Sequence, residues 1–332
     1  MGDCWMKSKI LVTRAVFPDV IARLGQHFEV DSNQEDRVFS SDELVEKMRG
    51  KDAMLASGSE RISAQVIAAS PALKAVCNMA VGYNNIDLDA ATRAGIMVTN
   101  TPDVLNETTA DFAWALLMAT ARRVTESERW LREGNWKKWR YDSFLGADVH
   151  GSILGIIGMG RIGQAIARRS RGFDMRVIYH NRSRLAVQLE HEANDAQYAD
   201  KEDLLRSADH VILVLPYSKE SHHTIGAAEL ALMKPSATLV NIARGGIVDD
   251  VALIAALRDN RIAAAGLDVF ENEPALHPDF LSLSNVVLTP HIASASEPTR
   301  RAMADCAADN LIAALTGGTP RNLLNPEVKR KK

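Results

Sequence analysis

The stretch Ile153-Leu154-Gly155-Ile156-Ile157-Gly158-Met159-Gly160-Arg161-Ile162-Gly163 decides the fold of this chain. Its apolar first half is typical of a buried strand, and a helical pattern over Arg161–Arg169 begins inside the glycine-rich turn. The first glycine permits a tight turn, the second lets backbone approach a phosphate, and the third lets the helix pack on the strand. Because a helix N-terminus also attracts negative charge, the turn predicts a dinucleotide site. A methyltransferase with a different adenosine-bearing cofactor is the main alternative.

Short apolar runs alternate with amphipathic stretches on both sides of this turn, a pattern that indicates parallel sheets covered by helices. A long helix is predicted from Thr108 to about Arg132, and a last helix near Thr299–Leu315. The last helix is expected to pack back on the first domain, since chain ends often lie close together. Four strands are predicted before the long helix, at Lys9–Thr13, Ala53–Ala56, Leu73–Cys77 and Ile96–Thr99. Six strands follow it and make a doubly wound sheet: Ile153–Ile157, Arg176–Tyr179, His210–Leu215, Ala237–Ile242, Ile262–Leu267 and Val286–Leu288.

The composition is that of a soluble globular protein of about two domains, with 332 residues, 46% hydrophobic residues and a net charge of −3. The only basic block is Lys329–Lys332, which we interpret as a solvated end, so neither nucleic-acid nor membrane binding is predicted. Cys4, Cys77 and Cys306 form no CxxC pair, so no disulfide framework and no metal site is predicted. No signal peptide or membrane span is predicted, and the cytoplasm is the expected location.

The residues after the second strand of the longer series bear on the choice of cofactor. An NAD enzyme usually carries an acidic residue there for the ribose 2′-hydroxyl, but no Asp or Glu occurs from Met175 through Gln188. The segment Asn181-Arg182-Ser183-Arg184 instead offers two arginines and a serine to a 2′-phosphate. The sequence therefore favours NADPH, with NADH as the weaker alternative; a solvated basic loop is the competing interpretation.

Four ionisable residues follow strands of the same predicted sheet: Arg244, Asp268, Glu273 and His291. Ligands of open parallel sheets bind outside the carboxyl ends of the strands. Each residue alone has an ordinary structural explanation, such as a helix cap or a surface loop, but together they indicate a site. Reduction of a carbonyl needs a proton donor and positive charge near the oxygen. His291 is suited to be the proton donor, with its ring oriented by Glu273. Arg244 is suited to bind a substrate carboxylate, and Asp268 to bind the nicotinamide carboxamide.

Six ordered motifs can be picked out in the sequence: Val81–Asp87, Asn106–Asp111, Gly158–Gly163, Asn241–Gly246, Gly266–Phe270 with Glu273-Pro274, and Thr289–His291. Together they resemble the D-isomer-specific 2-hydroxyacid dehydrogenase family, and within it the glyoxylate/hydroxypyruvate reductases and 2-ketogluconate reductases. The resemblance implies a Rossmann dinucleotide-binding domain, 102–290, inserted into a discontinuous flavodoxin-like substrate-binding domain, 1–101 and 291–332. It also implies a homodimer whose contact is largely formed by the long helix, and Trp136 or Trp139 is expected to reach the partner's substrate site or simply to pack in the interface.

The resemblance also assigns roles to individual residues. It implies that Arg244, Glu273 and His291 are catalytic, and that backbone amides at Val81 and Gly82 bind the substrate carboxylate. The loop containing Ser57 and Gly58 is expected to border the same substrate. The residues implied to contact the cofactor are Thr109, Gly158, Gly160, Arg161, Ile162, Gly163, Asn181, Arg182, Ser183, Arg184, Ile242 and Asp268.

The sequence departs from the family in one turn: Ile292-Ala293-Ser294 stands where many relatives have Ile-Gly-Ser. The alanine is tolerated unless φ at this position must be positive. The favoured function is an NADPH-preferring reductase of small 2-oxo acids such as glyoxylate, hydroxypyruvate or 2-ketogluconate. A dinucleotide-sensing binding protein on the same scaffold, like some corepressors, is the alternative from another class.

Overall fold

The computed structural model describes residues 7–328, so Cys4 and the basic run 329–332 lie outside the described residues. The chain divides into two compact units, Met1–Leu105 with Ser296–Lys332, and Asn106–Ala295. The expected domain boundaries were after residue 101 and before residue 291. In the structure, both points at which the chain passes from one unit to the other lie a few residues later in the sequence. As a result His291 belongs to the same unit as Arg244 and Glu273.

The first unit is a five-stranded parallel sheet in the order β2-β1-β3-β4-β5, which is the flavodoxin-like strand order. The edge strand β2 was not predicted, because its sequence Glu-Val-Asp-Ser has only one large apolar residue. The strands of the first unit are β1 (Lys9–Val12), β2 (Glu29–Ser32), β3 (Ala53–Ala56), β4 (Ala75–Asn78) and β5 (Met97–Thr99). Its helices are α1 (Pro18–His27), α2 (Ser41–Lys47), α3 (Ala64–Ala68), α4 (Leu88–Arg93) and α12 (Glu297–Leu315).

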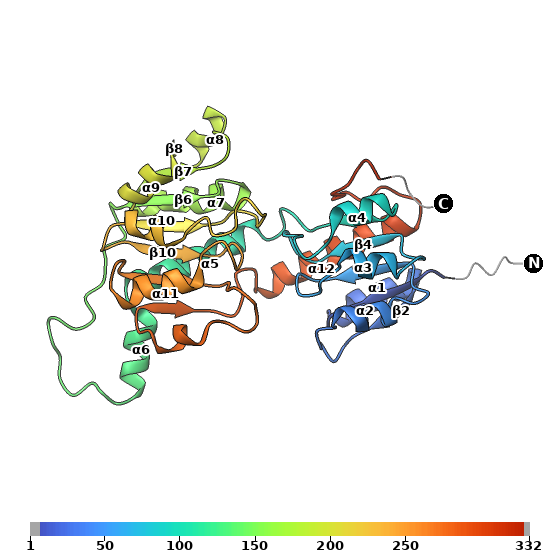
Figure 1. Cartoon of the computed structure of the whole chain (residues 1–332), viewed down its shortest axis with the longest axis horizontal. Helices are drawn as coiled ribbons and strands as arrows, with labels where there is room; N and C mark the ends of the chain where they lie inside the picture. The colour runs from blue at the N-terminus through green and yellow to red at the C-terminus, as the bar shows by residue number, and fades with distance from the viewer. Residues whose placement is uncertain (1–6, 329–332) are drawn as a thin grey trace, which may run out of the picture. The chain divides into compact units, whose positions relative to one another are not determined.

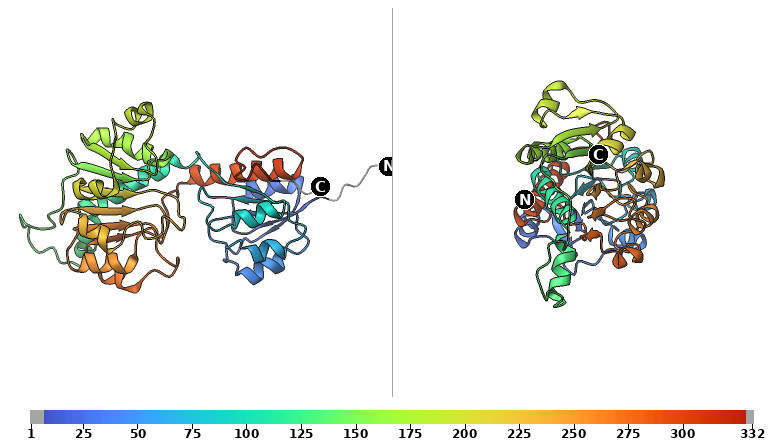
Figure 2. Two further views of the ribbon diagram at one scale, coloured as in Figure 1. Left: turned by 45° about the horizontal axis from the view of Figure 1, so that its top comes forward. Right: turned by 90° about the vertical axis from the view of Figure 1, so that its left-hand side faces the viewer.

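The last helix, α12, packs on β3 and β4 beside α1, as the sequence pattern predicted (Figures 1 and 2). Its N-terminus is defined by Ser296, whose side chain accepts a hydrogen bond from the Thr299 amide, and by proline in the first turn. The buried face of the helix includes Ala304, Ala307 and Leu311, which pack against apolar residues of β1, β3 and β4. The two small alanine side chains let the helix lie close to the sheet.

The second unit is a seven-stranded parallel sheet in the order β12-β11-β10-β9-β6-β7-β8. Counted from β6, this is the Rossmann order with one further strand beyond the sixth. The sequence predicted six strands; the additional one is β8, which has two residues and no apolar run. The strands are β6 (Ile153–Ile157), β7 (Arg176–His180), β8 (Gln197–Tyr198), β9 (His210–Leu213), β10 (Thr238–Asn241), β11 (Ala264–Leu267) and β12 (Val286–Leu288).

Helices cover both faces of this sheet, and each face has its own apolar core (Figure 1). On one face α5 packs against α7, β10 and β11, and on the other α10 packs between α9 and α11. The helices are α5 (Asn106–Ala121), α6 (Val124–Arg132), α7 (Arg161–Ser170), α8 (Val187–Glu192), α9 (Lys201–Ser207), α10 (Ala227–Leu232) and α11 (Asp250–Arg258). Two short 3-10 helices are η1 (Arg171–Phe173) and η2 (Pro278–Ser282).

The single long helix predicted from Thr108 to Arg132 is wrong, because the structure has two helices, α5 and α6. They are separated at Arg123, whose φ of 53° is left-handed. The Arg123 guanidinium is paired with Glu126 at 2.8 Å and donates to the Leu145 carbonyl. Since no glycine or proline marks this position, helical periodicity alone could not place the break.

Among residues 7–328, no helix combines the length and the apolar character that crossing a bilayer requires.

Candidate active site

The glycine-rich turn after β6 leaves open the surface that a pyrophosphate would need. Gly158 has φ +104°, and a Cβ there would lie 2.7 Å from the backbone carbon of Val214. A Cβ on Gly163 would collide with the Gly158 carbonyl oxygen, which explains how α7 packs so close to β6. Gly160 differs, because a Cβ there would meet nothing within 4 Å. Gly160 also caps α7, so this open space lies at the positive end of a helix, and the turn fits a dinucleotide phosphate.

The segment after β7 is tied to this turn by Asn181, whose Oδ1 accepts a hydrogen bond of 2.7 Å from the Met159 amide. Arg182 and Ser183 are exposed. Arg184 is paired through two nitrogens with Glu190, at 2.8 and 2.9 Å, and Tyr179 donates to the same carboxylate at 2.6 Å. Glu190 lies on α8, outside the segment 175–188 that contains no acidic residue, so the sequence alone did not indicate this pairing.

His291 and Glu273 form a hydrogen-bonded pair beyond the carboxyl ends of β11 and β12. His291 Nδ1 lies 2.8 Å from Glu273 Oε2, and Glu273 Oε1 accepts a second hydrogen bond of 2.9 Å from the Phe270 amide. Burial acts to raise the pKa of Glu273, but the hydrogen bond and charge of His291, the Phe270 amide and the charge of Arg244 together outweigh burial, so the pKa is lowered. The carboxylate is therefore held in its charged form, facing Nδ1. That leaves Nε2 of the ring to face a ligand.

Arg244 follows β10, which lies next to β11 in the sheet. Its guanidinium interacts electrostatically with the Glu273 carboxylate. Burial lowers the pKa of Arg244, and the negative charge of Glu273 acts in the opposite direction. One nitrogen donates to the Ala243 carbonyl at 2.7 Å. Arginine remains protonated at neutral pH even when buried, so a cation lies beside the His291–Glu273 pair. Three neighbouring strands thus bring together the three residues that the sequence singled out.

Asp268 is fully buried, and its carboxylate supports the loop that carries His291. Oδ1 accepts hydrogen bonds of 2.8 Å from the Thr289 hydroxyl and the Ile292 amide, and Oδ2 accepts one of 2.8 Å from the Ala293 amide. Burial raises the pKa of Asp268, and these three hydrogen bonds oppose the rise. The geometry shows Asp268 holding a loop. The predicted contact with the nicotinamide carboxamide stays a prediction.

Ala293, the departure from the family pattern, fits its position. His291 has a φ of 55°, whereas Ala293 has no positive φ. The condition under which an alanine here would be strained is therefore not met. Its amide donates to Asp268 and its side chain is buried.

The other cofactor residues expected from the sequence also lie in the second unit. Arg161 and Ile162 form the first turn of α7, where helical amides have no acceptor within the helix. Thr109 is buried in α5, and Ile242 is buried directly after β10.

Ser57, Gly58, Val81 and Gly82 lie in the first unit, after β3 and β4, which are adjacent strands. The side-chain amides of two asparagines hold the peptide groups of Val81 and Gly82 in place. Asn100 donates to the Val81 carbonyl at 2.8 Å, and Asn78 donates to the Gly82 carbonyl at 2.9 Å.

Within residues 7–328, neither the Val81 nor the Gly82 amide donates a hydrogen bond. Both amides are therefore available to an acceptor on a ligand. This arrangement fits the role that the family resemblance implies.

The sequence did not single out Glu60, which is fully buried and organises the neighbouring loop. Its Oε2 accepts from the Thr13 hydroxyl at 2.9 Å and from the Ser57 amide at 3.1 Å, and Oε1 accepts from Ser59 at 3.0 Å. A carboxylate in the middle of a polar loop has no sequence signature that separates it from a solvated one.

Comparisons with known proteins found a matching family and similar proteins. Residues 114–293 match the family described as D-isomer specific 2-hydroxyacid dehydrogenase, NAD binding domain. The glyoxylate reductase of Thermococcus onnurineus (strain NA1) is 50% identical over 327 residues, covering 97% of both chains. That of Pyrococcus furiosus is 49% identical over 327 residues, again covering 97% of both.

Solved structures show the same likeness. The NADPH-dependent glyoxylate/hydroxypyruvate reductase of Sinorhizobium meliloti, in complex with NADP and malonate, superimposes with a TM-score of 0.86 and 36% identity, covering 98% of this chain and 99% of that chain. A glyoxylate reductase from Paecilomyes thermophila gives a TM-score of 0.87 and 32% identity, covering 97% and 99%. The chain therefore belongs to the D-isomer specific 2-hydroxyacid dehydrogenase family and is an oxidoreductase that binds a nicotinamide dinucleotide.

Proposed function

We propose that this enzyme reduces glyoxylate to glycolate, and related small 2-oxo acids to D-2-hydroxy acids, with His291 as the proton donor. The observation that carries the proposal is the His291–Glu273 hydrogen bond of 2.8 Å beside Arg244. The relatives named glyoxylate reductase support the substrate class. Likeness to the Sinorhizobium meliloti glyoxylate/hydroxypyruvate reductase supports hydroxypyruvate as a substrate, and 2-ketogluconate rests on the motif resemblance alone.

A bound reduced nicotinamide supplies the hydride in this reaction. The chain's own residues then have three tasks. Arg244 offers a guanidinium fork to the carboxylate and the carbonyl oxygen of the substrate, and its charge stabilises the negative charge that develops on that oxygen. Since Glu273 occupies His291 Nδ1, the proton for the alkoxide comes from Nε2.

Replacement of His291 tests the proposed proton donor. For His291→Ala we expect kcat to fall by about 10²–10⁴, the usual contribution of a general acid, while the Kd for NADPH stays within twofold. Glu273→Gln should lose less, because the ring keeps a hydrogen-bonding partner. His191→Ala is the matched control, since His191 is an exposed histidine of the same unit paired with Asp195. Turnover by His291→Ala within threefold of the wild type would refute the assignment.

A substrate panel tests the substrate class separately. Glyoxylate, hydroxypyruvate, pyruvate and 2-ketogluconate are each offered with NADPH and with NADH, and absorbance of the reduced nicotinamide is followed. We expect glyoxylate and hydroxypyruvate to be reduced fastest. Cofactor binding without turnover of any of the four would favour a dinucleotide-sensing protein instead.

We propose a preference for NADPH, supported by the exposed Arg182 and Ser183 at the end of β7. Because Arg184 is already paired with Glu190, Arg182 is the better candidate for the 2′-phosphate. Arg182→Ala should lower kcat/KM for NADPH about 10–100-fold, as the loss of a charged hydrogen bond implies, with little change for NADH. Arg184→Ala is the matched variant and should have a smaller effect on the ratio. Equal use of both cofactors by the wild type would contradict the preference.

We also propose that the enzyme is a homodimer joined through the segment 124–145. This segment comprises α6 and the loop after it, which extend away from the sheet and helices of their unit (Figure 1). It exposes an unusual number of large apolar side chains, and such patches mark interaction surfaces: Val124, Leu131, Trp136, Trp139, Tyr141 and Leu145.

The double variant Leu131→Asp/Trp136→Asp should shift the enzyme from dimer to monomer in sedimentation velocity. Val187→Asp, which alters an exposed apolar residue on α8, is the control. A monomeric wild type at micromolar concentration would refute the proposed homodimer.

A further inference from the structure

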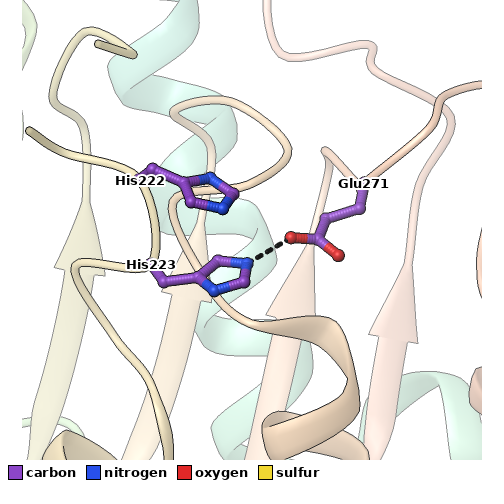
Figure 3. Close-up of side chains that lie close together, drawn as sticks. All are labelled: His222, His223 and Glu271. Atoms are coloured by element: carbon purple, nitrogen blue, oxygen red, sulfur yellow. Dashed lines mark hydrogen bonds and ion pairs between the residues drawn. The ribbon is translucent and has the colours of Figure 1, made fainter. Parts of the chain in front are cut away.

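Three side chains outside the proposed catalytic set converge at one point of the second unit: His222, His223 and Glu271 (Figure 3). Each offers one ligand atom, and these atoms all lie within 4.8 Å of one another. The two histidines belong to the loop after β9, and Glu271 belongs to the segment after β11. Segments nearly fifty residues apart in sequence therefore present two imidazoles and a carboxylate to the same point.

His223 is oriented as a metal-binding histidine would be. Its Nε2 faces Glu271 Oε1 at 2.5 Å, and on the other side of the ring Nδ1 lies 3.9 Å from Asp249 Oδ2. A histidine that binds a metal through one ring nitrogen usually has a carboxylate or carbonyl at the other. Asp249 is in the position to serve as that second partner.

His222 completes the set from the solvent side. Its ring stacks on the ring of His223, with centroids 3.8 Å apart, and its Nδ1 lies 3.2 Å from the Tyr217 hydroxyl. His222 is exposed, while the side chains of His223 and Glu271 are 35% and 27% exposed. An ion can thus enter from solvent and still reach two partly buried ligands.

The backbone that carries these ligands is fixed by hydrogen bonds. The His223 amide donates to the Gly246 carbonyl at 2.7 Å, and the Ile225 amide to the Ile247 carbonyl at 3.1 Å. The Glu271 amide donates to Asp250 Oδ2 at 3.1 Å. Both ligand segments are therefore held in place without an ion, which lowers the entropic cost of binding one.

We propose that His222, His223 and Glu271 form a binding site for a divalent transition-metal ion of the zinc type. Two imidazoles and one carboxylate suit Zn²⁺, Ni²⁺ or Cu²⁺, whereas Mg²⁺ and Ca²⁺ prefer oxygen ligands only. The ion replaces the hydrogen bond between His223 and Glu271, and water fills the remaining coordination position. Because Glu271 lies two residues before Glu273, the ion links the loop after β9 to the segment that orients His291.

The full-length enzyme, freed of metal with a chelator and dialysed, is titrated with Zn²⁺ in competition with a chromophoric chelator. We expect the wild type to bind one equivalent of Zn²⁺. The affinity for Zn²⁺ should be at least about tenfold weaker in both His222→Ala and Glu271→Gln. Loss of a neighbouring hydrogen-bond partner alone already costs a metal site 10–100-fold, so loss of a ligand should cost no less. Zn²⁺ should raise the Tm of the wild type and not of the variants, since an ion that binds only the folded chain stabilises it. A large excess of Mg²⁺ should not displace the ion.

Two matched variants separate this site from other zinc-binding groups. His191→Ala removes another exposed histidine that lies near a carboxylate, and His291→Ala removes the histidine of the proposed catalytic pair. Both should retain the equivalent of Zn²⁺ that His222→Ala loses, and zinc held by a thiol such as Cys306 would persist in every variant. The metal-free Tm of His222→Ala and Glu271→Gln is measured to show that they fold. Folded variants with wild-type zinc affinity, or a wild type without a zinc equivalent, would overturn the proposal.

Discussion

The buried carboxylate of Asp268 controls the loop that carries His291, and Asp268→Asn tests how strongly it does so. The wild-type carboxylate accepts three hydrogen bonds of 2.8 Å, from the Thr289 hydroxyl and the amides of Ile292 and Ala293. An amide has only one oxygen. In either orientation of the Asn side chain, an NH₂ group faces a backbone amide, so at least one buried N–H loses its acceptor.

The expected cost follows from these contacts. The variant loses a charge-assisted hydrogen bond and leaves a buried donor unpaired, each of which costs about 1–3 kcal/mol. Removal of the buried charge offsets part of this sum, because burial disfavours the ionised carboxyl and raises the pKa of Asp268. The free energy of local opening should therefore fall by about 2–3 kcal/mol, which corresponds to about 30- to 140-fold faster exchange of the Ile292 and Ala293 amides.

Hydrogen exchange followed by mass spectrometry on a peptide spanning residues 286–296 measures this opening directly. Thr289→Val, which removes a single donor, should give a smaller acceleration. Asp209→Asn is the matched control. Asp209 directly precedes β9, at the amino-terminal ends of the strands of the same sheet, where it accepts hydrogen bonds from the Ile153 amide at 2.8 Å and from Lys234 at 2.7 Å. It should leave the 286–296 peptide unchanged. If Asp268→Asn exchanges within twofold of the wild type at Ile292 and Ala293, Asp268 does not hold this loop.

Three further predictions rest on single observations. Gly163→Ala should lower the free energy of unfolding by about 1–3 kcal/mol in urea titration, because its Cβ would overlap the Gly158 carbonyl. Gly160→Ala should leave stability within about 1 kcal/mol but weaken NADPH binding in a fluorescence titration, because its Cβ points into open space; equal stability losses in the two variants would contradict this distinction. The pKa of Glu273 is lowered from 4.5 in the folded chain, so its contribution to stability is present above pH 4.5 and is lost as the pH falls through the folded pKa. The Tm difference between the wild type and Glu273→Gln should thus shrink as the pH falls below 4.5, and a difference that grows on acidification would reverse the assigned sign. Glu60→Gln should increase proteolysis in the loop Ser57–Ser59, which its carboxylate organises through Thr13, Ser57 and Ser59; an unchanged digestion pattern would show that the loop does not depend on this charge.

Several parts of the fold and site could be predicted from the sequence because the signals are local. The run Ile153–Ile157 followed by Gly158, Gly160 and Gly163 predicts a strand, a turn and a helix, since each glycine meets a separate steric need. The polar residues after β10, β11 and β12 could be assigned to one edge because parallel strands all end on the same side. Comparison with known proteins confirmed the family, the fold class and the oxidoreductase activity that these motifs indicated.

Only the tertiary structure decided the features that depend on which distant groups meet. Arg184 has the same sequence surroundings whether it is free or paired, and the fold pairs it with Glu190. Asp268 accepts hydrogen bonds from the amides of Ile292 and Ala293, and no local pattern in the sequence indicates these contacts. His222, His223 and Glu271 have no metal-binding spacing in the sequence, and they converge because β9, β10 and β11 are neighbours in the sheet. Each residue and its sequence neighbours determine the local steric requirements, whereas pairing between distant residues depends on the packing of the whole unit.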